Sequence, residues 1–165
     1  MLITEMKSLE CEQLLARLGT GRLACARDNQ PYIVPIYFAY EPDHLYGFAT
    51  LGRKIEWMRA NPLVCVQADE VLSHNHWTSV VVQGRYEELS DTPEYADDRR
   101  QAESLLEKRY LWWQTGYAAS QVRSHAKPAP PILYCIHVEG MTGLRASPDP
   151  VESAMASDNP KLRGR

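Results

Sequence analysis

The stretch that decides the fold is PYIVPIYFAYEPDHLYGFATLGRKIEWMRANPLVCVQAD, residues 31–69. It holds three runs rich in β-branched and aromatic residues, at 31–40, 45–50 and 63–69, and such runs are typical of strands. A four-residue turn joins the first two runs, and residues 53–60 have the pattern of a short helix. Parallel strands need a crossover of about a dozen residues or more. The short turn therefore predicts antiparallel pairing.

The same pattern continues on both sides of this stretch. Strands are expected at 22–27, 77–89 and 132–138, and residues 141–145 close the ordered part. Helices are expected at 9–18 and from Pro93 to about Arg109, because Thr92 followed by Pro93 is a helix-start signal. Residues 70–76 between two of the strands are expected to form a loop.

Six strands with mostly short connections make the protein mainly β with flanking helices. A closed or nearly closed antiparallel barrel is favoured, because closure removes exposed sheet edges. Pro35 lacks a backbone N–H, so it predicts an edge position or a bulge in its strand. Gly84 predicts a kink in the strand at 77–89.

Composition and charge limit the class of protein. The 165 residues carry a formal net charge of −3, which does not suit a nucleic-acid partner. The sequence contains no apolar run of the roughly 18 residues that a membrane span needs, and its start lacks a secretory-signal pattern. We therefore expect a cytoplasmic protein with one domain over residues 1–145. The proline-bearing segment 146–165 is expected to be a disordered tail.

Cysteine and histidine spacing gives no metal motif. The four cysteines are scattered without a C-x-x-C pair, so buried free thiols are favoured over a zinc ribbon or a disulfide framework. His74 and His76 alternate, but they fall in the expected loop, and no third ligand accompanies them. The prediction is that the chain has no metal site.

Two adjacent cations mark the start of the helix at 53–60. Gly52 is followed by Arg53 and Lys54, where the positive end of the helix dipole makes cations locally unfavourable. A bound anion would reverse that effect, with Arg as a forked donor, Lys as a point charge and the Thr50 hydroxyl nearby. A solvated surface pair is an equally good interpretation from spacing alone.

A second candidate lies at the start of the strand at 77–89. Trp77 and Ser79 are two residues apart, so their side chains share one face of the strand. Such a face suits a large flat ligand with a polar group. The pattern by itself favours the simpler interpretation, in which Trp77 covers the barrel core and Ser79 has no special role.

Taken together, four segments resemble one protein family. They are LGTGRLACARDNQPYIVPIYFAY, LYGFATLGRKIEWMRANPLVCV, WTSVVVQGRYEEL and ILYCIHVEGMTG, which span residues 13–143 in order. The chain resembles the pyridoxamine 5'-phosphate oxidase-like flavoproteins with the FMN-binding split-barrel fold, and it looks closest to the branch that includes 5-nitroimidazole resistance reductases. The resemblance implies a six-stranded antiparallel split β-barrel and an FMN cofactor held at a homodimer interface.

The resemblance also implies roles for individual residues. The phosphate ligands would be Thr50, Arg53 and Lys54. The strand around Pro35, Ile36 and Tyr37 would offer backbone groups to the polar edge of the flavin. Trp77 and Ser79 would lie near the isoalloxazine ring, and some of these contacts would come from the partner chain. Residues for binding a vitamin B6 substrate, in an R-x-H-x-R pattern near the C-terminus, are not visible.

Three functions stay open at this point. The leading one is an FMN-dependent oxidoreductase of unknown substrate. The second is a flavin carrier or sensor without turnover. The third is a haem-binding split barrel with His137 as axial ligand, although a strand histidine with a satisfied hydrogen bond is the favoured interpretation of His137.

Overall fold

One antiparallel sheet of eight strands dominates the computed structural model, which describes residues 1–109 and 131–149. The strands of this described part are β1 Leu2–Glu5, β2 Thr20–Arg27, β3 Gln30–Tyr37, β4 Ala39–Glu41, β5 His44–Ala49, β6 Leu63–Ser73, β7 His76–Glu88 and β8 Ile132–Ser147. The helices are α1 Ser8–Leu18, α2 Arg53–Ala60 and α3 Ala96–Glu107, the last preceded by the 3₁₀ turn Pro93–Tyr95. The mainly β, antiparallel fold with flanking helices is therefore confirmed.

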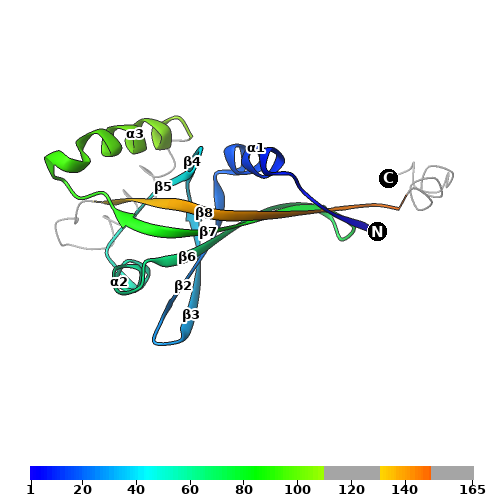
Figure 1. Cartoon of the computed structure of the whole chain (residues 1–165), viewed down its shortest axis with the longest axis horizontal. Helices are drawn as coiled ribbons and strands as arrows, with labels where there is room; N and C mark the ends of the chain where they lie inside the picture. Colours follow the sequence, from blue (N-terminus) through cyan, green and yellow to red (C-terminus); the bar gives the residue numbers. More distant parts are fainter. Residues whose placement is uncertain (110–130, 150–165) are drawn as a thin grey trace, which may run out of the picture.

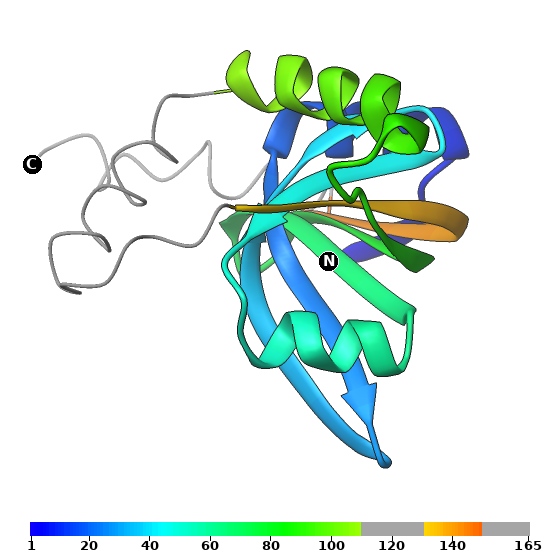
Figure 2. The same ribbon diagram turned by 90° about the vertical axis from the view of Figure 1, so that its left-hand side faces the viewer.

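The order of strands explains how the barrel closes. It runs β3-β2-β6-β7-β8-β5-β4, so β3 and β4 are the two edges of the path. These edge strands are consecutive in the chain and only Phe38 separates them. The sheet must therefore curl until its edges meet at Phe38, whose side chain is buried and whose N–H donates to the Gly19 carbonyl at 2.8 Å. Figure 2 shows β2 and β3 curving away from β8.

The strand expected at 31–40 is thus two strands. β3 pairs with β2, whereas β4 pairs with β5 on the opposite edge of the sheet. The break was not visible in the sequence because Phe38 is itself a good strand residue and its burial is a tertiary effect. Pro35 lies on the edge strand β3, as its missing N–H predicted.

The two longest pairings also differ from the expected boundaries. β6 and β7 form a hairpin with register from Leu63–Arg85 to Ser73–His76, so most of the loop expected at 70–76 is strand. β8 reaches Ser147, and its last residues pair with β1, a strand that was not expected. It thus extends two residues past the expected domain end at 145, while residues 150–165 lie outside the described residues.

Gly84 marks a bulge between β7 and β8. The register shifts between Gln83 and Gly84. A Cβ at position 84 would collide with the carbonyl oxygen of His137, so glycine is needed here for the close approach of two backbones. The extra residue of the bulge is Glu139 on β8, and β7 keeps its register with β6 at Gly84, so the irregularity lies opposite the position where the kink was expected.

Helices cover the barrel from two sides. In Figure 1, α1 and α3 lie above β8 and α2 lies below it, beside β2. The interior is filled mainly by aliphatic side chains, and the largest fully buried residues include Tyr134, Leu15, Ile55 and Met58. A smaller apolar cluster joins α3 to the outer side of β5 and β8 through Tyr46, Ala102, Leu106, Leu133 and Cys135. Within residues 1–109 and 131–149, every helix is too short or too polar to span a bilayer.

Candidate functional site

The start of α2 presents backbone donors and two cations. The first helical hydrogen bond runs from Glu56 to the Gly52 carbonyl at 3.1 Å, so the N–H groups of residues 53–55 precede the helical ladder. Gly52 is extended, with φ 176°, and a Cβ there would meet open space. Glycine is therefore not required by the backbone at this position, and it leaves the helix start uncovered.

Neither cation has a carboxylate partner in the described part of the chain. Arg53 is exposed, and its guanidinium carbon lies 5.4 Å from the centre of the Tyr32 ring. Lys54 is half-buried, and loss of water around its ammonium group lowers its pKa. Thr50 directly follows β5 and is exposed. Arg53 and Lys54 are thus two uncompensated cations at the helix start, and Thr50 lies two residues before Gly52 in the chain.

Several other arginines in the described part of the chain differ from Arg53 in having acidic partners, although Arg109 donates only to the Ala16 carbonyl. Arg59, at the far end of the same helix, binds the Glu88 carboxylate through two hydrogen bonds of 2.7 and 2.8 Å. Arg17 likewise pairs with Glu70, and Arg22 with Asp69. The absence of a partner for Arg53 and Lys54 is therefore not the general state of cations in this chain.

Strand β3 brings its three expected residues to a cavity. Pro35 and Tyr37 are exposed, whereas the Ile36 side chain is 4% exposed and points into the core. A cavity of about 340 Å³ is lined by all three and by Thr20, Gly21, Arg22 and Asp69. Because β3 is an edge strand, one row of its backbone groups is not used by the sheet, which suits the backbone contacts expected there.

Ser79 is connected to this cavity by a polar chain across the sheet. Its hydroxyl accepts a hydrogen bond from the Gln67 side chain at 3.0 Å, and the Gln67 oxygen accepts one from Arg22 at 3.2 Å. Arg22 also pairs with Asp69 and stands opposite Pro35 in register. Ser79 therefore has a defined structural role on the outer face of the sheet.

Trp77 lies on the same outer face, two residues before Ser79. It is half-buried and stands in register with Val71 and Ala146. Since Trp77 is not among the buried core residues, it is not a plug of the barrel interior.

The two groups of expected residues are separated within one chain. Tyr32, beneath Arg53, is in register with Cys25, whose side chain faces the core. Trp77 faces the other way and stands opposite Val71, seven positions along β6 from Val64, the partner of Cys25. Seven strand residues span about 23 Å. One chain therefore does not bring Trp77 together with Arg53 and Lys54.

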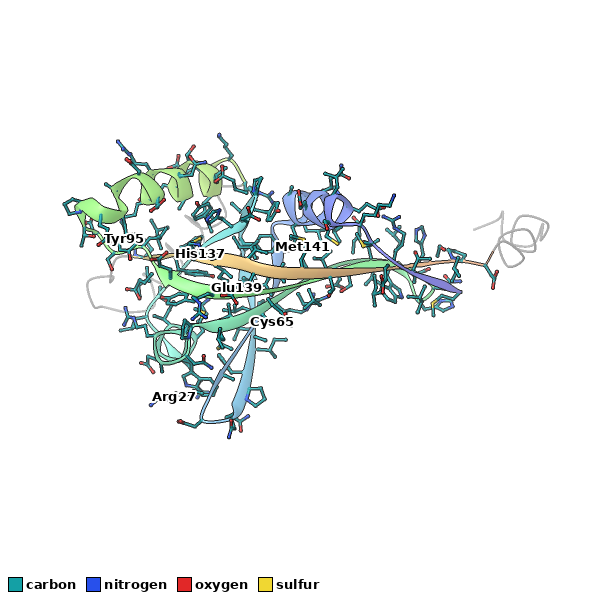
Figure 3. All side chains as sticks on the ribbon, viewed as in Figure 1. Arg27, Cys65, Tyr95, His137, Glu139 and Met141 are labelled. Atoms are coloured by element: carbon teal, nitrogen blue, oxygen red, sulfur yellow. The ribbon has the colours of Figure 1, made fainter. Side chains whose placement is uncertain are left out.

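The structure also brings together three residues that the sequence analysis did not combine. His44, Cys135 and His137 place potential metal-donor atoms within 4.8 Å of one another. The available sequence signal was the alternation Cys135-x-His137 on a strand; the contribution of His44 depends on the pairing of β5 with β8. Figure 3 shows His137 and Tyr95 under α3. His74 and His76 are not part of this group, and Trp112 and Trp113 lie outside the described residues.

Comparison with known proteins gives one family. A family model described as pyridoxamine 5'-phosphate oxidase matches residues 7–145. An uncharacterized protein of Rhizobium meliloti (strain 1021) is 42% identical over 146 residues, which are 88% of this chain and 97% of that protein. A crystal structure of a FAD-binding protein from Mesorhizobium loti is 44% identical with a TM-score of 0.73, covering 90% of this chain and 99% of that one.

More distant structures share the fold. A protein of Bacteroides thetaiotaomicron, provisionally assigned to 5-nitroimidazole antibiotic resistance, is 20% identical with a TM-score of 0.63, covering 89% of this chain and 92% of that one. The haem storage protein HutZ of Vibrio cholerae is 14% identical with a TM-score of 0.60, covering 81% and 92%. The split-barrel fold expected from the sequence is confirmed by these likenesses together with that to the Mesorhizobium loti protein.

Proposed function

The chain belongs to the pyridoxamine 5'-phosphate oxidase family, and from this membership and the geometry at α2 we propose that it binds a flavin nucleotide through Arg53 and Lys54. The single observation that carries the proposal is the pair of cations without carboxylate partners beside free helix N–H groups. Phosphate is the part of a flavin nucleotide that fits such a site, because it is anionic and accepts several hydrogen bonds.

The remaining expected residues fit the rest of the ligand. Tyr32 and Arg53 place the helix start beside β3, and residues 35–37 come three to five positions later, about 10–17 Å along the strand. A ring system extending from the phosphate along the edge of β3 would meet Pro35, the Ile36 backbone and Tyr37. When bound, the flavin supplies the ability to accept and donate electrons, while the chain's residues bind and orient it.

FMN is the proposed form of the flavin. The cation pair at Arg53 and Lys54 accounts for one terminal phosphate. The relative from Mesorhizobium loti is described as FAD-binding, so FAD is the alternative that must be tested. Deazaflavin is a further alternative with the same phosphate chemistry.

A homodimer is proposed because a part of the outer sheet surface holds exposed apolar side chains. On β5 and β8, α3 covers the outer side. On the outer face of β3, β6 and β8, Ile33, Leu63, Val71 and Leu144 are 62%, 53%, 62% and 44% exposed, and no described helix packs over them. A two-fold partner would bury such a surface. We propose that the partner's Trp77 and Ser79 make the flavin-ring contacts, since one chain does not bring Trp77 to the start of α2.

We favour an oxidoreductase over a carrier or sensor because a flavin beside an open cavity can meet a substrate. The 340 Å³ cavity at Pro35 and Tyr37 provides that access. The haem alternative has less support, since the likeness to the haem storage protein HutZ, at 14% identity, shows the fold alone.

The decisive experiment is a visible absorption spectrum of the purified protein with chromatography of the released cofactor. Flavin bands and released FMN are expected. Released FAD would mean that the site also holds a diphosphate. A Soret band would indicate that the protein binds haem in place of flavin. Oxidation of a reduced nicotinamide by the flavin-loaded protein would then support an enzyme. Stable flavin binding without turnover for any tested electron donor would favour a carrier.

A further inference from the structure

Three donor side chains meet on the outer side of the barrel beneath α3. His44 on β5 is in register with His137 on β8, and Cys135 lies two residues before His137 on the same face. Cross-strand neighbours of this kind have Cβ atoms about 4.5–5.5 Å apart. The donor atoms of the three side chains all lie within 4.8 Å of one another, and the two imidazole rings meet edge to face at 5.2 Å between centres.

Each imidazole has one ring nitrogen held by an acceptor. Nδ1 of His44 lies 2.9 Å from the Pro42 carbonyl oxygen, and Nε2 of His137 lies 2.6 Å from a Glu87 carboxylate oxygen. Both acceptors lack a proton to give, so these nitrogens carry the N–H. Nε2 of His44 and Nδ1 of His137 are left as lone-pair donors. Metal-binding histidines typically show this pattern, with the second nitrogen donating to a carbonyl or a carboxylate.

The electrostatic surroundings favour a cation. Burial, and after it the negative charges of Glu87, Asp98 and Glu41, raise the pKa of the Cys135 thiol to about 12, and the same three charges would attract a cation to this place. Glu87 is further held by the Tyr95 hydroxyl at 3.0 Å. Arg85, opposite His137 on β7, is paired with Glu139 at 3.2 Å. The described side chains around the three donors therefore carry more acidic than unpaired basic groups.

We propose that His44, Cys135 and His137 bind a zinc ion, with water as the fourth ligand. Two imidazoles and a thiolate are a donor set that suits Zn²⁺, whereas Ca²⁺ and Mg²⁺ take oxygen ligands. Zinc at about 2.0 Å from nitrogen and 2.3 Å from sulfur holds its ligand atoms about 3.3–3.5 Å apart in a tetrahedral site. Side-chain movements of about 1 Å would bring the three donor atoms from separations of up to 4.8 Å to these distances. On binding, the Cys135 S–H bond breaks, the thiolate bonds to zinc and the proton goes to solvent.

The ion would link β5 to β8. His44 begins β5, and the chain runs from β5 to Thr50 and α2. Cys135 and His137 belong to β8, the central long strand. A zinc ion here would fix β5 against β8 and raise the thermal stability of the barrel, since a ligand that binds only the folded state stabilises it.

Metal titration of tag-free, chelator-treated full-length protein tests the site. One equivalent of Co²⁺ per chain should produce a thiolate-to-cobalt charge-transfer band and visible d–d bands, and Zn²⁺ should abolish them by displacement. Zn²⁺ should also raise the melting temperature. The cobalt difference spectrum and zinc competition with a chromogenic chelator do not depend on flavin, so failure of flavin binding would leave this result unaffected.

Variants identify the ligands. Cys135→Ser should abolish the charge-transfer band, and both this change and His44→Gln should weaken zinc binding by more than the roughly 10–100-fold expected for Glu87→Gln, which alters only the outer carboxylate. Cys65→Ser and His76→Gln change a thiol and an imidazole elsewhere, and they should bind zinc as the parent does. Thermal melting of each metal-free variant checks that it is folded. If Cys135→Ser does not fold, the zinc affinity of His44→Gln, which changes a half-exposed residue, tests the site. A parent that binds no stoichiometric metal, or a folded His44→Gln that binds as tightly, overturns the proposal and leaves a hydrogen-bonded histidine pair.

Discussion

Two regions of the molecule differ in what they lack. One has charged side chains without an ionic partner, and the other has apolar surface without cover. At the start of α2, Arg53 and Lys54 have no carboxylate partner among the described residues. On the outer face of β2 and β6, the cation Arg22 is paired with Asp69 and linked through Gln67 to Ser79, while the apolar Leu63, four positions before Gln67 on β6, is 53% exposed. The first region has uncompensated charge, and the second has uncovered apolar surface.

The difference indicates what each region binds. An uncompensated, partly desolvated cation is costly unless an anion joins it, whereas exposed apolar surface favours a protein partner. The α2 region therefore suits a small anionic ligand, and the outer face suits a second copy of the chain. The predictions below change one region at a time and use the other as a control.

The largest effect is expected at the cation pair. Arg53→Ala with Lys54→Ala should weaken FMN binding by about 3–6 kcal/mol, since hydrogen bonds to charged groups are worth about 1.5–3 kcal/mol each. This corresponds to about two to four orders of magnitude in Kd. Riboflavin, which has no phosphate, should lose far less affinity. Fluorescence titration of both ligands measures the difference.

Arg59→Ala is the matched control for this prediction. It removes an arginine from the same helix, but one that already binds Glu88. FMN affinity in Arg59→Ala should stay close to that of the parent. Equal FMN affinity in the double variant and the parent would remove the phosphate assignment.

The next largest effect is expected on assembly. Leu63→Asp places a carboxylate in the uncovered outer face and should weaken a dimer by about 2–3 kcal/mol, from lost apolar burial and an added buried charge. Light scattering over a range of concentrations measures it. Leu9→Asp on α1 changes a leucine of similar exposure, 63% against 53%, outside this face, and it should leave the dimer intact. A parent that is monomeric at micromolar concentration would rule out the dimer.

The fold was accessible from sequence wherever local pattern and tertiary structure agree. The helix at 53–60 and the edge position of Pro35 depend on local chemistry, and both are present. The break at Phe38 and the strand β1 were missed. Phe38 breaks the strand because the sheet must close there, and β1 exists because it pairs with the far end of β8.

The candidate site was accessible in part for the same reason. The cations at 53 and 54 are adjacent in sequence, so the pattern located them. The group of His44, Cys135 and His137 combines residues about 90 positions apart, which only the pairing of β5 with β8 brings together. The division of the expected flavin residues between two faces likewise depends on which side of the sheet each strand position faces.

A smaller effect is expected on the stability of the flavin-free protein. Desolvation lowers the Lys54 pKa, so the charged form is disfavoured in the folded state. Lys54→Met should therefore stabilise the flavin-free protein by the order of 1 kcal/mol, a usual size for one substitution, and should destabilise it relative to the parent when FMN is present. Thermal melting with and without FMN shows whether Lys54→Met melts above the parent in the absence of FMN and below it in its presence.

The pH dependence of that difference has a definite sign. The folded state loses the Lys54 proton at lower pH than the unfolded state, so the penalty is fully present below the folded pKa. It shrinks as the pH rises from the folded pKa toward the ordinary lysine value of 10.5. The melting difference between parent and Lys54→Met should therefore narrow in alkaline buffer. A difference that does not change with pH would indicate that packing, not charge, is responsible.

The smallest effect is expected at Trp77, the point where the two regions would meet across a dimer. An aromatic contact with the flavin ring is worth about 0.5–1.5 kcal/mol beyond burial, so Trp77→Ala should weaken FMN binding by about 2–12-fold. Trp77→Phe should keep most of the affinity but brighten bound flavin, because it removes electron transfer from the indole.

Trp57 is the matched control for Trp77. It lies on α2 with its ring 5.4 Å from that of Tyr32, near the phosphate end of the proposed site. Because the ring end of the flavin extends away from α2 in this arrangement, Trp57→Phe should brighten bound flavin less than Trp77→Phe does. Flavin emission in Trp77→Phe equal to that of the parent would place the isoalloxazine away from this face, and brightening in Trp57→Phe alone would place it against α2.

Thermal melting of the Trp77 variants separates a flavin contact from a loss of core packing. Because Trp77 is half-buried on the outer face, its removal should destabilise the fold by less than the about 3–5 kcal/mol of a buried aromatic truncation.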